Sequence, residues 1–429
     1  MVDLELGLTK GGPTWGELLG SNNWEELMDP LNNDLRRLVI RCGDLCQVTY
    51  DTFINDPTSD YCGFSRYKKE DLLRKTAFPG GSDRYEVVGF LYGTACVSVH
   101  EALLIKSLSR LSRESWDKES NWIGFIAVTN DKASKEVGRR EVYVVWRGTT
   151  RHYKWVNNLG FSHQSLKPLL PEFTYGKETA TSLKYHHEHP LDPNESADNE
   201  AEYHHLEPKV MKGWLTIYTA ENTKSPFTKL SARAQFLSKI KDLLDQYKNE
   251  DLSIVLTGHS LGATLSVLSA FDIVENLKTD IPVSAIVYAC PKVGSQLFKE
   301  RLEAHPNLKV LHIRNTVDLI PHYPPAVMRY VHVGTELEID TRKSHYLKES
   351  NNPSDWHNLQ AMIHVVNGWH GIKSEFVLKV KRSLALVNKS CDYLTEECSV
   401  PPCWWVVKNK GMVKNEEGEW VLARPIPEF

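Results

Sequence analysis

Two hydrophobic periods alternate along the chain. Residues 254–256 are a continuous apolar run that stops at a glycine, which predicts a short buried strand, and beyond Gly262 the apolar positions recur at helical spacing as far as Val274. Comparable runs predict strands at 85–95, 122–129, 141–146, 283–289, 309–313 and 329–339. Comparable helical periods predict a short amphipathic helix and a turn within 10–34, and helices at 35–50, 231–247 and 359–366. Residues 210–218, the helix at 231–247 and the strand at 253–256 together predict a βαβ unit. Strands that alternate with helices indicate an α/β fold with a mostly parallel central sheet flanked by helices.

The turn between the strand at 253–256 and the helix that follows carries the first candidate chemistry. Its sequence, Gly258-His-Ser260-Leu-Gly262, is a G-x-S-x-G in the strand–turn–helix context of a nucleophile elbow. A serine at the tip of such a turn takes a strained backbone conformation, and a Cβ two residues to either side would collide with the neighbouring strand or helix. The alternative is an ordinary turn between a strand and a helix. The context favours Ser260 as a nucleophile.

A second turn, Arg147-Gly148-Thr149-Thr150, follows the predicted strand at 141–146. It lies at the carboxyl edge of the sheet, where sites of α/β proteins assemble. An acyl-transferring serine needs two hydrogen-bond donors for the developing oxyanion. The residue after the nucleophile, Leu261, supplies one from its backbone, and Thr149 fits the second. A threonine that only caps a loop is the alternative for Thr149.

An acid and a base follow the serine in chain order. Asp318 lies just beyond the strand at 309–313, and His357 lies at the junction between a loop and the helix at 359–366. The order Ser…Asp…His is that of α/β-hydrolases, in which the carboxylate holds the tautomer of the histidine and the histidine activates the serine. We expect His357 to be the base and keep His364 as the alternative. His322 and His370 also compete for this role.

Bulky apolar and basic side chains follow the second turn. This composition predicts a lid over an apolar cleft, with Trp155, Val156 and Leu159 facing the cleft or a lipid surface, although a surface helix packed on one side is an equal alternative. Residues 172–208 are polar and contain five histidines, with no strand or helix period that would fix a ligand geometry. We expect an insertion loop there and no metal site, and the proposed chemistry requires no cofactor.

Composition narrows the class of protein. With 41% hydrophobic and 25% charged residues and a net charge of −4 over 429 residues, the chain is typical of a globular protein and gives no reason to expect nucleic acid. No apolar run approaches the roughly 18 residues of a membrane span. The first residues lack a basic region followed by an apolar core, and they include Asp3 and Glu5, so we expect neither a secretory signal nor a transit peptide. Eight dilute cysteines favour reduced thiols, and together these features predict a cytoplasmic protein.

Taken together, the motifs resemble those of the class 3 lipases, and more closely the class II branch of the plant phospholipases A1. The resemblance is carried by Trp146-Arg-Gly-Thr-Thr150, Thr257-Gly-His-Ser-Leu-Gly-Ala263, Cys290-Pro-Lys-Val-Gly294, Asn315-Thr-Val-Asp318-Leu-Ile-Pro321 and His357-Asn-Leu-Gln-Ala. It extends into the tail, at Pro401-Pro-Cys-Trp-Trp405. It implies one α/β-hydrolase domain over residues 1–429, with a helical clasp at 1–80, a lid and insertion at 151–208, and an extension at 374–429. The Cys290-Pro pair, where small residues are commoner, and the histidine-rich insertion depart from the pattern and bear on substrate preference.

The resemblance implies a serine acylhydrolase that cleaves the sn-1 acyl ester of glycerophospholipids through an acyl-enzyme. It assigns Ser260, Asp318 and His357 to the triad, and Thr149 with Leu261 to the oxyanion hole. A galactolipid, a monoacylglycerol or a triacylglycerol is the alternative substrate. A non-catalytic lipase-like signalling scaffold is the alternative of another class, although a binding protein does not need all three triad residues. The expected partners are an acyl lipid and, peripherally, a membrane surface; the sequence leaves the oligomeric state open.

Overall fold

The architecture comes from a computed structural model that describes residues 8–56, 58–94, 120–149, 162–170, 207–405 and 408–423. Within these residues lies a seven-stranded sheet in the order β1-β2-β3-β6-β7-β8-β9. The first three strands pair antiparallel, and the pairs from β3 through β9 are parallel. The strands are β1 (Tyr85–Thr94), β2 (Ser120–Thr129), β3 (Arg140–Trp146), β6 (Leu252–His259), β7 (Val283–Tyr288), β8 (Leu308–Asn315) and β9 (Thr335–Ile339). This sheet confirms the predicted α/β-hydrolase fold.

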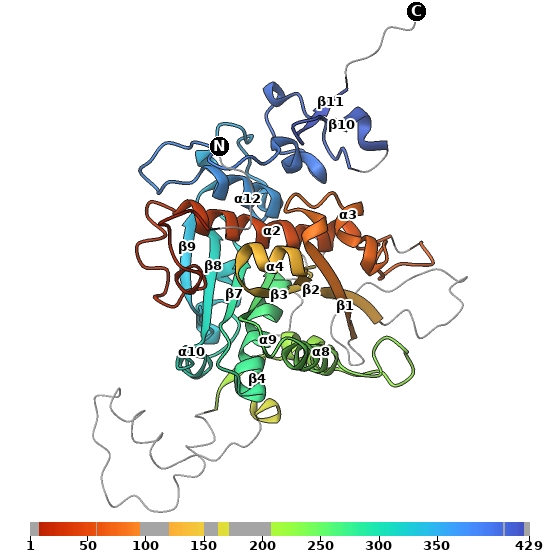
Figure 1. Ribbon diagram of the computed structural model, residues 1–429, viewed down its shortest axis with the longest axis vertical. Coiled ribbons are helices and arrows are strands. Elements are labelled where there is room, and N and C mark those ends of the chain that lie inside the picture. The colour runs from red at the N-terminus through yellow and green to blue at the C-terminus, as the bar shows by residue number, and fades with distance from the viewer. Residues whose placement is uncertain are drawn as a thin grey trace, which may run out of the picture.

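Helices cover both faces of the sheet (Figure 1). On one face, α2 (Asn33–Thr52) packs against β3, β6 and β7 and against α12 (Leu359–Gly368). On the other face, α9 (Leu261–Leu277) packs against β3, β6, β7 and β8, with α8 (Ala232–Gln246) against β1 and α10 (Gln296–Glu303) against β8. The remaining helices are α1 (Trp15–Leu18), α3 (Leu72–Lys75), α4 (Asp131–Val137), α7 (Lys212–Thr219) and α11 (Pro353–Trp356). Each face of the sheet therefore has its own buried hydrophobic cluster.

Local sequence explains where the principal helices begin. The side chain of Asn32 accepts hydrogen bonds from the N–H groups of Asp34 and Leu35 at the start of α2. Ser231 and Asn358 cap α8 and α12 in the same way. A short polar side chain satisfies N–H groups that have no acceptor within the helix, so these residues set the first turn.

The C-terminal part of the chain folds back onto α2. It contains short 3₁₀ turns and a hairpin of β10 (Met412–Lys414) and β11 (Trp420–Leu422), which lies beyond α2 and α12 in Figure 1. Two buried ion pairs make the connection: Arg382 Nη2 lies 2.7 Å from Asp44 Oδ1, and Lys389 Nζ lies 2.5 Å from Asp51 Oδ2. Because Asp44 and Asp51 are both on α2, the extension fixes the helix that covers the central strands.

The prediction for residues 210–218 is wrong. Only Lys209–Met211 is a strand, β5, which pairs with β4 (His163–Ser165), and Lys212–Thr219 forms helix α7. Aromatic and β-branched residues favour strands, but Trp214, Leu215 and Tyr218 are spaced so that one helical face is buried. The strand before β6 in the sheet is instead β3. There is therefore no βαβ unit over 210–256.

The short amphipathic helix and turn predicted within 10–34 are confirmed as α1 and the turns that follow it as far as Asn32. One other element is shorter than predicted. The strand expected over 329–339 is limited to β9, which begins after a glycine at position 334 with a positive φ of 75°. A side chain on Gly334 would meet the Val310 carbonyl oxygen at 2.4 Å. The chain therefore turns at this glycine before it joins the sheet edge.

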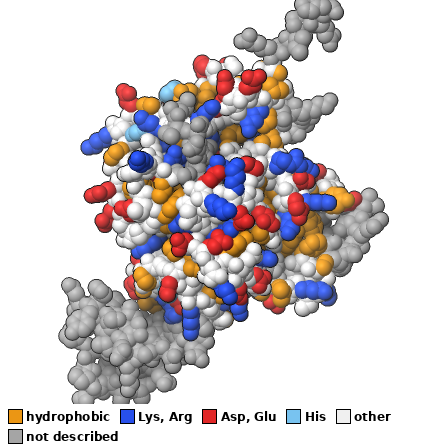
Figure 2. Space-filling model, viewed as in Figure 1, with side chains coloured by type: hydrophobic (Ala, Val, Ile, Leu, Met, Phe, Trp, Pro, Cys, Tyr) orange, Lys and Arg blue, Asp and Glu red, His pale blue; other side chains and the backbone are white. Residues whose placement is uncertain are grey.

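Within the described ranges, no helix is both long and apolar enough to cross a bilayer. Basic and acidic side chains are interspersed over the face of the molecule seen in Figure 2.

Candidate active site

Ser260 lies between β6 and α9 in a conformation that L residues rarely adopt, with φ 59° and ψ −123°. A Cβ on Gly258 would lie 2.2 Å from the carbonyl of Gly262, and a Cβ on Gly262 would lie 2.3 Å from the Trp146 carbonyl oxygen. Both distances are shorter than a van der Waals contact, so only glycine fits at these positions. The crowding inferred from the sequence is present, and the strand–turn–helix context forms a sharp elbow.

The elbow is anchored to its neighbours by backbone hydrogen bonds. The Ser260 N–H donates to the Tyr288 carbonyl at the end of β7, at 3.0 Å. Leu261 is the first residue of α9, where N–H groups have no acceptor within the helix and the positive end of the helix dipole is located. Ser260 is only 3% exposed, so a reaction at this serine proceeds away from bulk water.

Asp318 and His357 are in contact. His357 Nδ1 lies 2.6 Å from Asp318 Oδ2, and the Ile320 N–H donates to Oδ1 of the same carboxylate at 2.9 Å. The Asp318 side chain is fully buried, whereas that of His357 is 15% exposed. A buried carboxylate held in this way favours the tautomer of His357 that has its proton on Nδ1, so Nε2 is the ring nitrogen that can accept a proton.

Asn315 ties the loop of His357 to the strand that leads to Asp318. Its Nδ2 donates to the carbonyl of Trp356, the residue before His357, at 2.7 Å. Its Oδ1 accepts from the Thr341 N–H at 3.1 Å. Asn315 is fully buried at the end of β8. The acid and the base therefore have a common support.

The Arg147-Gly148-Thr149 turn lies against the elbow. A Cβ on Gly148 would lie 2.5 Å from the His259 carbonyl oxygen, so glycine is needed for this approach. The Arg147 guanidinium is buried, donates to the Gly148 carbonyl at 2.8 Å and lies over the ring of Phe53. Burial lowers the pKa of Arg147 to about 10, against the opposing effect of Tyr50. Thr149 follows directly in the chain.

The competing histidines have other partners. His364 is buried on α12, where its Nε2 lies 2.7 Å from the Ser344 hydroxyl, and burial followed by the charges of Arg382 and His345 lowers its pKa to about 3. His370 Nδ1 contacts the Gly368 carbonyl, and His322 is exposed in a short 3₁₀ turn. Among these histidines, the structure brings His357 onto Asp318.

Several predicted elements lie outside the described residues. They include the lid residues Trp155, Val156 and Leu159, and all but the last two residues of the histidine-rich insertion at 172–208.

Sequence reasoning missed four residues that support the site. Arg147 and Asn315 lie within motifs that carry the family resemblance, and this position could have marked them as part of the site. The motifs alone, however, assign them no role. Tyr50 and His259 contact one another near His357. Tyr50 is more than two hundred positions away from His259 in the sequence, and nothing in its local pattern marks it.

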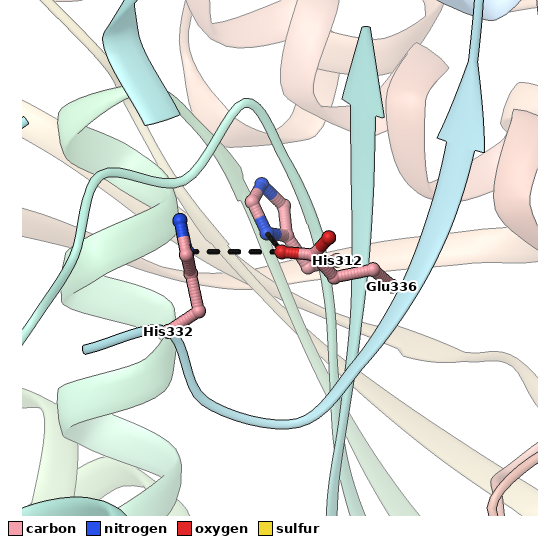
Figure 3. A group of neighbouring side chains, drawn as sticks. All are labelled: His312, His332 and Glu336. Carbon is pink, nitrogen blue, oxygen red and sulfur yellow. Dashed lines mark ion pairs between the residues drawn. The ribbon is translucent and has the colours of Figure 1, made fainter. Parts of the chain in front are cut away.

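One further cluster has the composition of a metal site (Figure 3). His312 on β8, His332 in the loop before β9, and Glu336 on β9 offer ligand atoms within 4.8 Å of one another. However, His312 Nε2 accepts the Cys290 N–H at 2.9 Å, so the proton of the neutral ring is on Nδ1, the atom that faces Glu336 at 3.7 Å. The second carboxylate oxygen of Glu336 accepts from Arg314 at 3.1 Å. These atoms fit a hydrogen-bonded ion-pair network better than a metal ligand set.

Fold and site together define a serine hydrolase of the α/β-hydrolase class. A profile of the family described as Lipase (class 3) matches residues 143–328. The chain is 55% identical to phospholipase A1-IIdelta of Arabidopsis thaliana, over 97% of this chain and 98% of that protein. It is 44% identical to phospholipase A1-II 5 of Oryza sativa subsp. indica, over 100% of this chain and 86% of that protein. The chain therefore belongs to the class 3 lipases, in their phospholipase A1-II group.

Solved lipases show a weaker likeness. A lipase from Rhizopus microsporus var. chinensis is 15% identical, with a TM-score of 0.40 over 79% of this chain and 82% of that chain. The sheet order and the elbow at Ser260 define the α/β-hydrolase fold of this chain.

Proposed function

We propose that this chain is a phospholipase A1 that hydrolyses the sn-1 acyl ester of glycerophospholipids. The observation that carries the proposal is the 2.6 Å contact between His357 and Asp318, on the same edge of the sheet as the strained Ser260. The near-full-length similarity to proteins named phospholipase A1 supports the substrate class.

In the proposed reaction, the hydroxyl oxygen of Ser260 attacks the ester carbonyl while His357 Nε2 accepts the hydroxyl proton. Asp318 stabilises the imidazolium that forms. The backbone N–H of Leu261 donates one hydrogen bond to the oxyanion, and Thr149 donates the second. Collapse of the tetrahedral intermediate expels the lysophospholipid alkoxide, which takes the proton from His357. Water then hydrolyses the acyl-enzyme by the same steps in reverse, with His357 as the base, and releases a fatty acid.

A Ser260→Ala variant tests the nucleophile. We expect hydrolysis to fall by at least about 10³-fold while the melting temperature stays near that of the wild type, since the triad acts as a unit. A fluorophosphonate probe should label the wild-type protein and not the variant. Labelling that persists in Ser260→Ala would assign the nucleophile elsewhere, and a folded wild type that neither reacts with the probe nor hydrolyses esters would favour the signalling scaffold.

The position of cleavage is tested by mass spectrometry. Phosphatidylcholine with different acyl chains at sn-1 and sn-2 should yield a lysolipid that retains the sn-2 chain. Faster turnover of galactolipid or acylglycerol vesicles under the same conditions would favour the alternative substrates.

Contact with a membrane surface and a cytoplasmic location belong to the same proposal. Support comes from the sequence of 151–161, in which Trp155, Val156 and Leu159 are flanked by Arg151 and Lys154. Burial of an indole at a lipid surface stabilises binding by about 2 kcal/mol, or roughly 30-fold in partitioning. We expect Trp155→Ala to lower turnover on phospholipid vesicles about 10-fold and hydrolysis of a soluble short-chain ester only a few-fold. Equal losses on the two substrates would mean that Trp155 lines the wall of the pocket.

Imaging of a fluorescent fusion protein in cells tests the proposed cytoplasmic location.

A further inference from the structure

A tyrosine from the N-terminal helix contacts the histidine that precedes the nucleophile. Tyr50, near the end of α2, places its hydroxyl oxygen 2.7 Å from His259 Nδ1. The two rings meet edge to face, with centroids 5.7 Å apart. The contact joins a helix on one face of the sheet to the tip of the central strand β6.

The His259 ring also contacts His357. The two ring centroids are 4.4 Å apart at an angle of 39°. His259 is 5% exposed, and its Nε2 atom is buried without a hydrogen-bond partner of good geometry. Burial and then the charge of His357 hold the pKa of His259 well below its usual range, while the backbone carbonyl of His357 acts in the opposite direction. His259 is therefore neutral near neutral pH.

The hydroxyl of Tyr50 determines the tautomer of this neutral ring. Burial raises the pKa of Tyr50, so the phenol keeps its proton. When the phenol donates to His259 Nδ1, the proton of the imidazole resides on Nε2, on the side of the His357 carbonyl. Tyr50 thus holds the His259 ring at Nδ1. The Nε2–H group of the same ring points toward the backbone of His357.

The same hydroxyl also reaches the turn formed by Arg147, Gly148 and Thr149. A Cβ on Gly148 would lie 2.1 Å from the Tyr50 hydroxyl oxygen, which shows how closely the two approach. Tyr50 therefore contacts both the turn that precedes Thr149 and the histidine that precedes Ser260.

We propose that Tyr50 and His259 are positioning residues that hold the His357 ring and the Gly148 turn against the Ser260 elbow. The proposal rests on the hydrolase function proposed above and adds a requirement for a neutral His259. When His357 accepts the serine proton it becomes positively charged, and a second charge on a ring in contact with it would oppose that step. The charged and titratable groups that face this pair are Cys46 on α2, Arg147 just after β3, His357, and Asp318 behind His357.

The test uses the Tyr50→Phe variant of the full chain with 4-nitrophenyl butyrate, a soluble ester that needs no membrane. We expect kcat to fall about 10-fold and KM to stay within about 2-fold, because the change affects the reacting geometry and leaves the acyl pocket intact. Tyr218→Phe is the matched control. Its buried hydroxyl donates to Asp272 Oδ2 at 2.7 Å, and Tyr218 belongs to the hydrophobic cluster on the face of the sheet opposite α2. The control should lose stability and keep its kcat.

Two further measurements separate positioning from a general structural effect. In a His357→Ala background, Tyr50→Phe should cause a smaller loss in the rate of fluorophosphonate labelling than in the wild type, because the part of its effect that acts through His357 is then absent. His259→Gln, which keeps a polar group near Nε2, should retain more activity than His259→Phe.

Either a wild-type kcat in Tyr50→Phe or a full 10-fold loss of labelling in the His357→Ala background would overturn the proposal. A Ser260→Ala variant that stayed active would instead contradict the proposed function itself, so the two failures are distinguishable.

Discussion

Close backbone approach sets the geometry of individual residues in this site. The carbonyl of His259 and the hydroxyl of Tyr50 both lie where a side chain on Gly148 would be, and the Trp146 carbonyl lies where a side chain on Gly262 would be. The turn at Gly148 and the elbow therefore meet backbone to backbone, and α2 reaches this turn through the Tyr50 side chain. Such contacts limit how far the reacting atoms can move relative to one another.

The assignment of the base can be tested at the residue level. We expect His357→Ala to lower hydrolysis by at least about 10³-fold, as Ser260→Ala does, because either change disables the same unit. His364→Gln should keep activity within a few-fold of the wild type, since His364 contacts Ser344 and lies away from Asp318. Steady-state kinetics on 4-nitrophenyl butyrate provides the comparison. The reverse order of the two losses would transfer the role of base to His364.

The sequence revealed the reacting residues more readily than their supports. Ser260, Asp318 and His357 could be predicted because each follows a strand or precedes a helix in a fixed chain order, and that order reflects the chemistry. Tyr50 could not be predicted in this way. Its helical spacing on 35–50 indicates only that it belongs to α2, whereas its contact with His259 depends on how α2 crosses β6.

At the level of elements, the sequence predicted buried strands and capped helices well and the edges of the fold less well. Strands β3 and β6 are buried throughout because both faces of the sheet are covered, and the apolar runs within them predicted these strands. Residues 212–219 are also rich in aromatic and β-branched residues, but they pack beside α8 and α9 as a helix. Short apolar runs do not distinguish these outcomes without the tertiary context.

A buried ion pair attaches the C-terminal extension to helix α2, and its contribution to stability can be tested. Arg382 and Asp44 are each only 2% exposed, and Arg382 also donates to Gln360. Arg382→Met should lower the free energy of unfolding by about 3–5 kcal/mol, because it leaves a buried carboxylate without its partner. Urea denaturation measures this change. Lys348→Met is the control, since the Lys348–Asp392 pair is exposed and such pairs contribute about 0–1 kcal/mol. Equal changes in the two variants would mean that the buried pair does not fasten the extension.

At the scale of the whole molecule, two hydrophobic clusters pack against the seven-stranded sheet, one on each face. Residues of the N-terminal helices and of the C-terminal extension belong to the cluster on the α2 face. Their inclusion explains why the family resemblance extends well beyond the residues matched by the lipase profile. Helix α2, which carries Tyr50, is thereby held from both ends of the chain.

The pH dependence of global stability follows from histidines that the fold holds neutral. Burial lowers the pKa of His364 to about 3 and that of His332 to about 4. In the unfolded chain each of these residues binds a proton below about pH 6.5. Between that pH and the lowered value, the unfolded state holds one more proton per histidine than the native state does. Stability therefore falls as the pH falls, by about 1.4 kcal/mol per pH unit for each histidine.

A His364→Gln variant should remove the contribution of that residue. Glutamine can still pair with the Ser344 hydroxyl, and it does not titrate, so the native contacts near Arg382 and His345 are largely retained. We expect the free energy of unfolding to decline between pH 6 and pH 5 by about 1.4 kcal/mol less in the variant than in the wild type. Urea denaturation at both pH values measures the difference. If the wild type and His364→Gln lose stability in parallel, then His364 is protonated in the native state near neutral pH, and its burial does not contribute to acid sensitivity.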